Sequence, residues 1–202
     1  MRGKQLGKGV LCILLIAGLA ACTTAQKQIA LRQNSTATEV FEEVQDQVPP
    51  AKNVTDLLIK ASIKTPVFGH HLFESETHRH GKPGYPFVFN VDGQGIMWKV
   101  DDGYEGPSPD AENQAKGPET GEGFRYLLAK RIRLAPGSHT IFLGLPDEDY
   151  FTQNTIDIGI DRVNVLEYRP VYRKTGRGIA SHFLHGIKAY ELYLNGTRID
   201  KQ

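Results

Sequence analysis

Four histidines within eleven residues could hold a transition metal. They are His70, His71, His78 and His80. Glu74 and Glu76 lie between them, and imidazole together with carboxylate is a ligand set that suits zinc or copper. The spacing matches no established metal site, and histidines in a solvated loop need no metal. The sequence therefore favours a solvated loop, with metal binding by these histidines as the alternative.

The segment from Asp101 to Gly123 could bind a hard cation through carboxylates. It contains seven acids and a single base, Lys116. Calcium takes oxygen ligands, but the regular aspartate spacing of a calcium-binding loop does not occur here. Acids mixed with glycine and proline are also what an exposed loop contains. We expect an exposed loop that is a candidate contact surface, since long loops are often functional.

A basic and aromatic group near residue 170 could hold an anion. Its members are Arg169, Tyr172, Arg173 and Lys174. Guanidinium and ammonium groups beside aromatic rings can bind phosphate or an anionic glycan. A solvated turn between two strands accounts for the same residues, so both interpretations stay open.

Residues 178–186 contain Ser181, His182 and His185, which could belong to a hydrolase. A nucleophilic serine needs a positioned base and an orienting acid. No G-x-S-x-G turn occurs anywhere in the sequence. We therefore expect no enzymatic activity.

Residues 1–21 have the composition of a bacterial secretion signal. Arg2, Lys4 and Lys8 precede an apolar run from Val10 to Ala21, and the segment contains no acid. The run is too short to span a bilayer, which takes about 20 apolar residues. The sequence therefore predicts a signal peptide that is removed.

The tetrapeptide Leu19-Ala20-Ala21-Cys22 resembles the lipobox of bacterial lipoproteins. The resemblance implies cleavage before Cys22 and diacylglyceryl modification of its thiol. Acyl chains would then anchor the protein permanently, at about 0.8 kcal/mol per buried CH₂. Because Thr23 rather than aspartate follows, the resemblance also implies the outer membrane, facing the periplasm or the surface. The alternative is an ordinary signal peptide whose cleavage site adjoins a cysteine.

The cysteines and charges limit the mature chain further. Cys12 lies within the expected signal and Cys22 would carry lipid, so we expect no disulfide. The net charge is +1 for the whole sequence and −2 after residues 1–21 are removed, with 21 bases against 23 acids. This balance argues against a nucleic-acid partner and against non-specific adhesion to anionic polymers. The covalent lipid is the only cofactor that we expect.

Residues 22–52 are expected to form a lipidated tether with one short helix. Thr23 to Ser35 is polar and aperiodic, and a flexible coil of this length reaches roughly 20 Å. Thr36 and Glu39 form a capping-box pattern, and valines then recur at four-residue spacing up to Pro49-Pro50. This pattern predicts a helix that ends at the prolines.

Residues 53–202 are expected to form one β domain. Apolar and polar residues alternate over Leu57 to Ile63, as in a strand with one buried face. Asp92-Gly93 and Asn195-Gly196 predict hairpin turns, and Lys130 interrupts its strand as an edge or bulge residue would. Seven or eight such strands predict an all-β fold, an antiparallel β-sandwich.

Two turn motifs resemble those of PEGA modules of bacterial surface proteins. One strand ends in Asp92-Gly93, and the segment from Leu134 to His139 (Leu-Ala-Pro-Gly-Ser-His) leads into another. The resemblance covers residues 87–168 and implies a small non-catalytic β module at the cell envelope. We therefore expect a lipoprotein whose sandwich is a binding or structural module for an envelope protein or glycan. The alternative is a periplasmic metal-binding lipoprotein that uses the histidine-rich loop.

Overall fold

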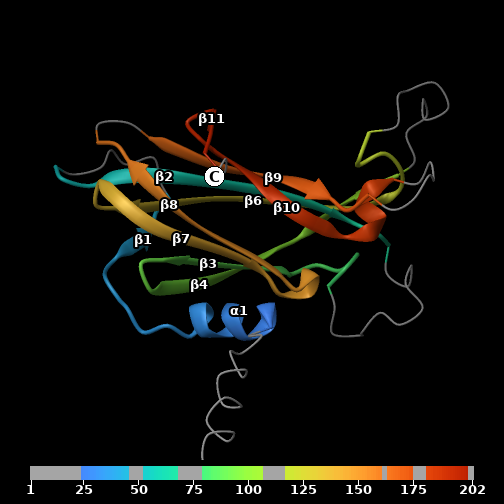
Figure 1. The fold of residues 1–202 in the computed structure, drawn as a ribbon, viewed down its shortest axis with the longest axis horizontal. Coiled ribbons are helices and arrows are strands. Elements are labelled where there is room, and N and C mark those ends of the chain that lie inside the picture. The colour runs from blue at the N-terminus through green and yellow to red at the C-terminus, as the bar shows by residue number, and fades with distance from the viewer. Residues whose placement is uncertain are drawn as a thin grey trace, which may run out of the picture.

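The computed structural model describes residues 24–45, 52–67, 79–106, 117–160, 163–174 and 181–199. Within these ranges two sheets pack face to face, which confirms the all-β class (Figure 1). The elements are α1 (Ala25–Gln33), β1 (Phe41–Glu43), β2 (Thr55–Thr65), β3 (Tyr85–Val91), β4 (Gln94–Val100), β5 (Asp102–Glu105), β6 (Gly123–Leu134), β7 (Gly137–Leu145), η1 (Pro146–Glu148), β8 (Tyr150–Ile158), β9 (Asn164–Tyr172), η2 (His182–His185), β10 (Ile187–Leu194) and β11 (Thr197–Arg198).

The larger sheet has the order β1-β6-β2-β9-β10-β11, and β5 pairs with β6 beyond the end of β1. The smaller sheet has the order β4-β3-β7-β8. Of the eleven strands in the described ranges, β1, β5 and β11 are only two to four residues long, and the other eight match the expected number. The pair β2 and β9 is parallel, which alternation within each strand could not reveal.

The alternating pattern of β2 positions the core as expected. Leu57, Ile59 and Ile63 are buried between the sheets. They pack with the aromatic residues of β3, of which Phe87 and Phe89 are fully buried. Lys130 lies opposite Ile59 in unbroken register, so the bulge alternative was wrong. The edge alternative fits, because among the described strands β1 pairs with β6 only at residues 132–134 and β5 only at residues 123–126.

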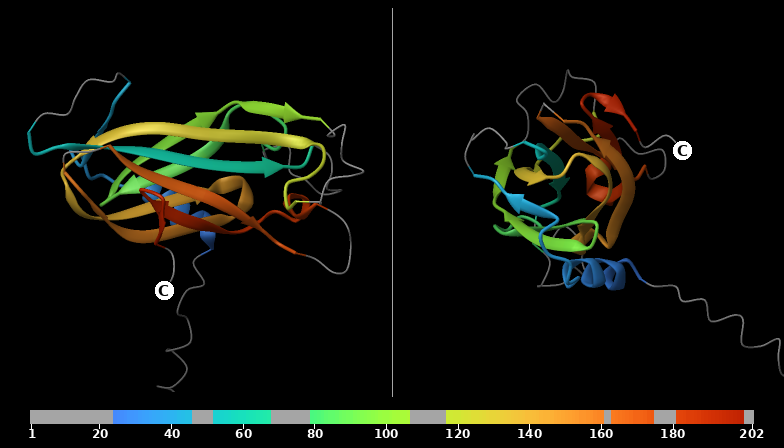
Figure 2. Two further views of the ribbon diagram at one scale, coloured as in Figure 1. Left: turned by 90° about the horizontal axis from the view of Figure 1, so that it is seen from above. Right: turned by 90° about the vertical axis from the view of Figure 1, so that its left-hand side faces the viewer.

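Helix α1 covers the outer face of the smaller sheet (Figure 2). Its Ile29 is buried against Val88 and Phe142, which point away from the main core. Gly95 and Gly144 have no side chains, so the helix can approach the sheet closely there. Strand β3 is therefore buried on both faces, and its burial does not alternate.

The expected tether and helix were wrong in position. The helix occupies Ala25–Gln33, within the segment expected to be a flexible tether. In the expected helix, Glu39 has a φ of 63° and Phe41 begins β1 with its side chain in the core. The side-chain oxygen of Gln94 accepts hydrogen bonds from the Val40 and Phe41 amides, so tertiary contacts outweigh the local pattern. Residues 46–50 of that prediction lie outside the described ranges, and the sandwich includes β1, which precedes residue 53.

The two turn motifs, Asp92-Gly93 and the segment from Leu134 to His139, contact each other. His139 Nδ1 lies 2.7 Å from Asp92 Oδ2, and the other carboxylate oxygen accepts from the Thr140 amide at 2.7 Å. His139 Nε2 also lies 2.9 Å from the carbonyl oxygen of Ala135. The Asp-Gly turn between β3 and β4 is thereby joined to the turn that begins β7.

Candidate functional site

A cavity of about 400 Å³ lies at the end of the sandwich where β2 and β9 finish. We call it the end cleft; η2 lies at this end, on the right in Figure 1. Its lining residues are Lys64, Thr65, Pro66, His80, Glu148, Arg173, Phe183, Leu184, His185 and Gly186. The cleft brings together His80, Arg173 and His185, which come from three different candidate groups in the sequence.

A buried ion pair forms one wall of the end cleft. His80 Nε2 lies 2.7 Å from Glu148 Oε1, and both side chains are at least nine-tenths buried. The Tyr85 hydroxyl donates to the same carboxylate oxygen at 3.1 Å. Burial raises the pKa of Glu148, but the hydrogen bond and charge of His80 and the Tyr85 hydroxyl outweigh it, so the pKa is lowered overall. The Glu148 carboxylate is therefore held by two hydrogen-bond partners within the protein, His80 and Tyr85.

The sequence missed Glu148 because it lies 68 residues from His80. It belongs to the short η1, in which Pro146 occupies the first position and Asp149 caps the end in the left-handed region. The run Pro-Asp-Glu-Asp at residues 146–149 could have predicted the turn that positions Glu148, since such residues favour a tight turn.

The four residues of the expected anion group do not form one surface. Arg169 donates to Glu167 at 2.8 Å and its guanidinium lies over the ring of Tyr193, away from the cleft. Tyr172 is 3% exposed and its hydroxyl donates to Glu119 at 2.6 Å, so it cannot contact a ligand at the surface. Arg173 and Lys174 are exposed, and Arg173 lines the end cleft. The prediction of a surface contact was wrong for Tyr172, and Arg169 lies on a different surface from Arg173.

Lys64, at the end of β2, lines the cleft and contacts residues of the acidic segment from Asp101 to Gly123. Its ammonium lies 2.8 Å from Glu105 and donates to the carbonyl oxygens of Glu119 and Gly121 at 3.1 and 2.7 Å. Arg125 bonds both Glu105 and Glu119. Two described acids of this segment, Glu105 and Glu119, are thus partners of Lys64 or Arg125. Glu105 lies in β5 rather than in the exposed loop that we expected.

Two of the residues in the segment considered for a hydrolase hydrogen-bond to residues 118–120. The hydroxyl of Ser181 donates to the carbonyl oxygen of Thr120, and the Phe183 amide donates to Pro118 at 3.1 Å. These bonds fasten η2 to residues 118–120. His185 lines the end cleft on the side of η2.

The metal and lipid predictions fall mainly outside the described residues. His70, His71, His78 and Cys22 all do. His80 is described and is bonded to Glu148. Within the described ranges no group of three or more histidine, cysteine or acidic side chains could hold a metal ion.

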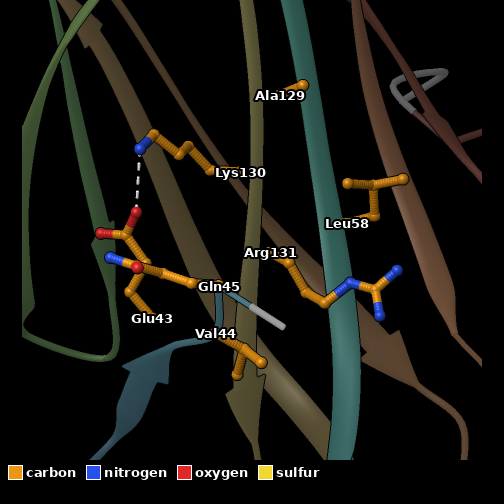
Figure 3. Close-up of a pocket in the computed structure, with 7 residues that line it drawn as sticks. All are labelled: Glu43, Val44, Gln45, Leu58, Ala129, Lys130 and Arg131. Carbon is orange, nitrogen blue, oxygen red and sulfur yellow. Dashed lines mark hydrogen bonds and ion pairs between the residues drawn. The ribbon is translucent and has the colours of Figure 1, made fainter. Parts of the chain in front are cut away.

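A second hollow lies beside β6, on the side of the larger sheet (Figure 3). We call it the side groove; it measures about 370 Å³ and is lined by Glu43, Val44, Gln45, Leu58, Ala129, Lys130 and Arg131. Its charges are compensated, since Lys130 contacts Glu43 at 2.9 Å and Arg131 lies 3.7 Å from Asp56. The end cleft differs because no described acid forms an ion pair with Arg173.

None of the helices in the described ranges is long and apolar enough to cross a membrane. Comparison with known proteins gave no match to any family model, to any curated protein or to any solved structure.

Proposed function

We propose that this protein is a cell-envelope lipoprotein whose sandwich binds, without catalysis, an anionic glycan in the end cleft. Cys22 would carry the lipid, and Arg173 and Lys174 would contact the anionic groups. The resemblance of the two turn motifs to PEGA modules is part of the same proposal.

The observation that carries the proposal is the position of Arg173. Arg173 lines a cavity whose one acidic lining residue, Glu148, is buried and hydrogen-bonded to His80. Among the described residues, neither Arg173 nor the neighbouring Lys174 forms an ion pair. Counted over the described residues, the mouth of the cleft therefore has an excess of positive charge. A guanidinium can bind carboxylate or phosphate oxygens in a bidentate manner.

The backbone supports Arg173 at this place. The Arg173 amide donates to the carbonyl oxygen of Gly186 at 3.1 Å, which joins the end of β9 to the end of η2. Gly186 has a φ of 74°, a conformation that favours glycine. The backbone of Arg173 is thus fixed by this hydrogen bond, which favours a specific contact between its side chain and a ligand.

Two observations support binding rather than catalysis. The Ser181 hydroxyl donates a hydrogen bond to the carbonyl oxygen of Thr120, and His80 is hydrogen-bonded to Glu148. A nucleophile and its base need to lie within hydrogen-bond distance of each other, and these two groups are bonded elsewhere.

Retention on immobilised glycans tests the proposal. The full acylated chain in detergent is passed over lipopolysaccharide and over peptidoglycan, as wild type and as the double variant Arg173→Gln, Lys174→Gln. We expect retention of the wild type on one of the two glycans and a several-fold loss in the double variant.

Arg169→Gln is the matched control, because Arg169 is an exposed arginine of β9, the strand after which Arg173 directly follows, and it does not line the cleft. It should be retained like the wild type. Equal retention of all three proteins, or no retention of the wild type, would overturn the proposed site.

A further inference from the structure

The structure leaves little chain between the expected lipid and the folded body. Thr24 is the first described residue and α1 begins at Ala25, only three residues after Cys22. Two residues span at most about 7 Å from Cys22 to Thr24. The interfacial layer on each side of a bilayer is itself about 5–7 Å thick. A lipid on Cys22 would therefore bring α1 to the membrane surface, instead of leaving the body roughly 20 Å away as the expected tether would.

Helix α1 cannot swing away without losing its contacts. Ile29 is 2% exposed against the smaller sheet. Asn90 Nδ2 donates to the carbonyl oxygen of Arg32 at 2.9 Å, and the Arg32 guanidinium donates to Gln153 at 2.8 Å. Gln26 donates to the carbonyl oxygen of Pro146. The helix and the sheet beneath it are therefore one unit, and the orientation of the helix fixes the orientation of the sandwich.

The outward side of this unit combines apolar and basic groups. Leu31 is 63% exposed on α1, and Phe151 is 38% exposed on β8, where it stacks on Phe142. The helix carries Lys27 and Arg32 and no acid. Exposed apolar side chains with nearby bases suit the interface of a membrane that contains anionic lipid.

We propose that α1 and the outer face of the smaller sheet lie against the membrane, with Leu31 and Phe151 at the lipid interface. The inference rests on the proposed lipid at Cys22. The larger sheet then faces away from the bilayer, on the opposite side of the sandwich from α1 (Figures 1 and 2). The end cleft lies at the side and stays open to a ligand.

Fluorescent labels at two positions test this orientation. A single cysteine is introduced by Leu31→Cys or by Leu127→Cys; the mature chain would have no other free thiol, because Cys12 is removed with the signal and Cys22 is acylated. Leu127 lies on β6 in the larger sheet and is also 63% exposed, which makes it a matched control. Each acylated protein is labelled and reconstituted in vesicles of phosphatidylethanolamine and phosphatidylglycerol.

We expect the label at position 31 to be quenched by nitroxide-bearing lipid and shielded several-fold from aqueous iodide. The label at position 127 should show the reverse. Flotation of the vesicles is measured first. A chain that does not float with the vesicles overturns the lipid anchor and this inference together. A chain that floats, but whose two labels are equally open to iodide, overturns the orientation alone.

Discussion

His80 and Glu148 form a 2.7 Å ion pair inside the end cleft, although they are far apart in the sequence. The pair joins the segment that precedes β3 to η1, which follows β7. Glu148 also accepts from Tyr85, whose ring stacks on Tyr126 in the core with centroids 4.4 Å apart. The wall of the cleft is therefore tied to the packed interior.

Removing one member of this pair should cost more than removing both. His80→Ala leaves the buried Glu148 carboxylate without its imidazole partner, and breaking a buried pair typically costs about 3 kcal/mol or more. In the double variant with Glu148→Gln the buried charge is gone, so we expect part of that loss to be recovered. Urea unfolding of the wild type, both single variants and the double variant measures the coupling. Strictly additive losses would show that the two groups do not stabilise each other.

Acid should destabilise the fold through Glu105 and Glu148. The hydrogen bond from Arg125 lowers the pKa of Glu105 from 4.5 to about 2. Burial alone would raise this pKa, and the hydrogen bond from Lys64 lowers it further. The pKa of Glu148 is also lowered. A carboxylate with a lowered pKa in the folded state stabilises fully above its unfolded pKa, and this stabilisation is lost as the pH falls towards the folded pKa.

We therefore expect the free energy of unfolding to fall between about pH 5 and pH 2, and less steeply in Glu105→Gln. Urea unfolding at several pH values measures the slope. Glu42→Gln, at a carboxylate that is 70% exposed, should leave the slope as it is in the wild type. The assignment fails if Glu105→Gln retains the full acid dependence.

Lys64→Met should loosen the segment before β6. The Lys64 side chain is 3% exposed, and its ammonium contacts Glu105 and two backbone carbonyl oxygens. Hydrogen bonds to charged groups contribute about 2 kcal/mol. Hydrogen exchange should therefore quicken in residues 117–123. Lys60→Met, at an exposed position of the same strand, is the control and should leave exchange unchanged. Wild-type exchange in Lys64→Met would mean that the segment is held by other contacts.

Gly95→Ala should displace α1 from the sheet. A Cβ at Gly95 would overlap the backbone carbonyl oxygen of Arg32, which cannot rotate away as a side chain could. Such overpacking costs about 1–3 kcal/mol. We expect faster hydrogen exchange in α1 and a lower free energy of unfolding. Gly103→Ala, whose Cβ would meet its nearest atom at 3.8 Å, should behave like the wild type; equal behaviour of the two variants would contradict the close approach of the helix.

Local patterns predicted the larger strands because each pattern reports one buried face. The alternation in β2 and the Asp92-Gly93 turn between β3 and β4 are both realised in the structure. The same approach failed for residues 24–45. The single buried residue of α1, Ile29, leaves no amphipathic pattern, and the capping-box pattern at Thr36 yields to the contacts of Phe41 with the core.

The candidate site was predictable only in part. Arg173 and Lys174 could be identified from their own chemistry. The sequence could not show that Arg169 is separate from them. Arg173 lines the cleft, whereas Arg169 contacts Glu167 and Tyr193 on a different surface. The partnership of His80 with Glu148 depends on how β3 and η1 are brought together, and no short-range pattern encodes it.

Lipid on Cys22 is the central claim, since both the envelope location and the orientation of the sandwich depend on it. The most direct test is metabolic labelling with radioactive palmitate of cells that express the wild type or Cys22→Ser. We predict that label appears on the wild-type protein, which floats with the membranes, and that Cys22→Ser carries none. Unlabelled wild-type protein, or equal labelling of Cys22→Ser, would contradict the account.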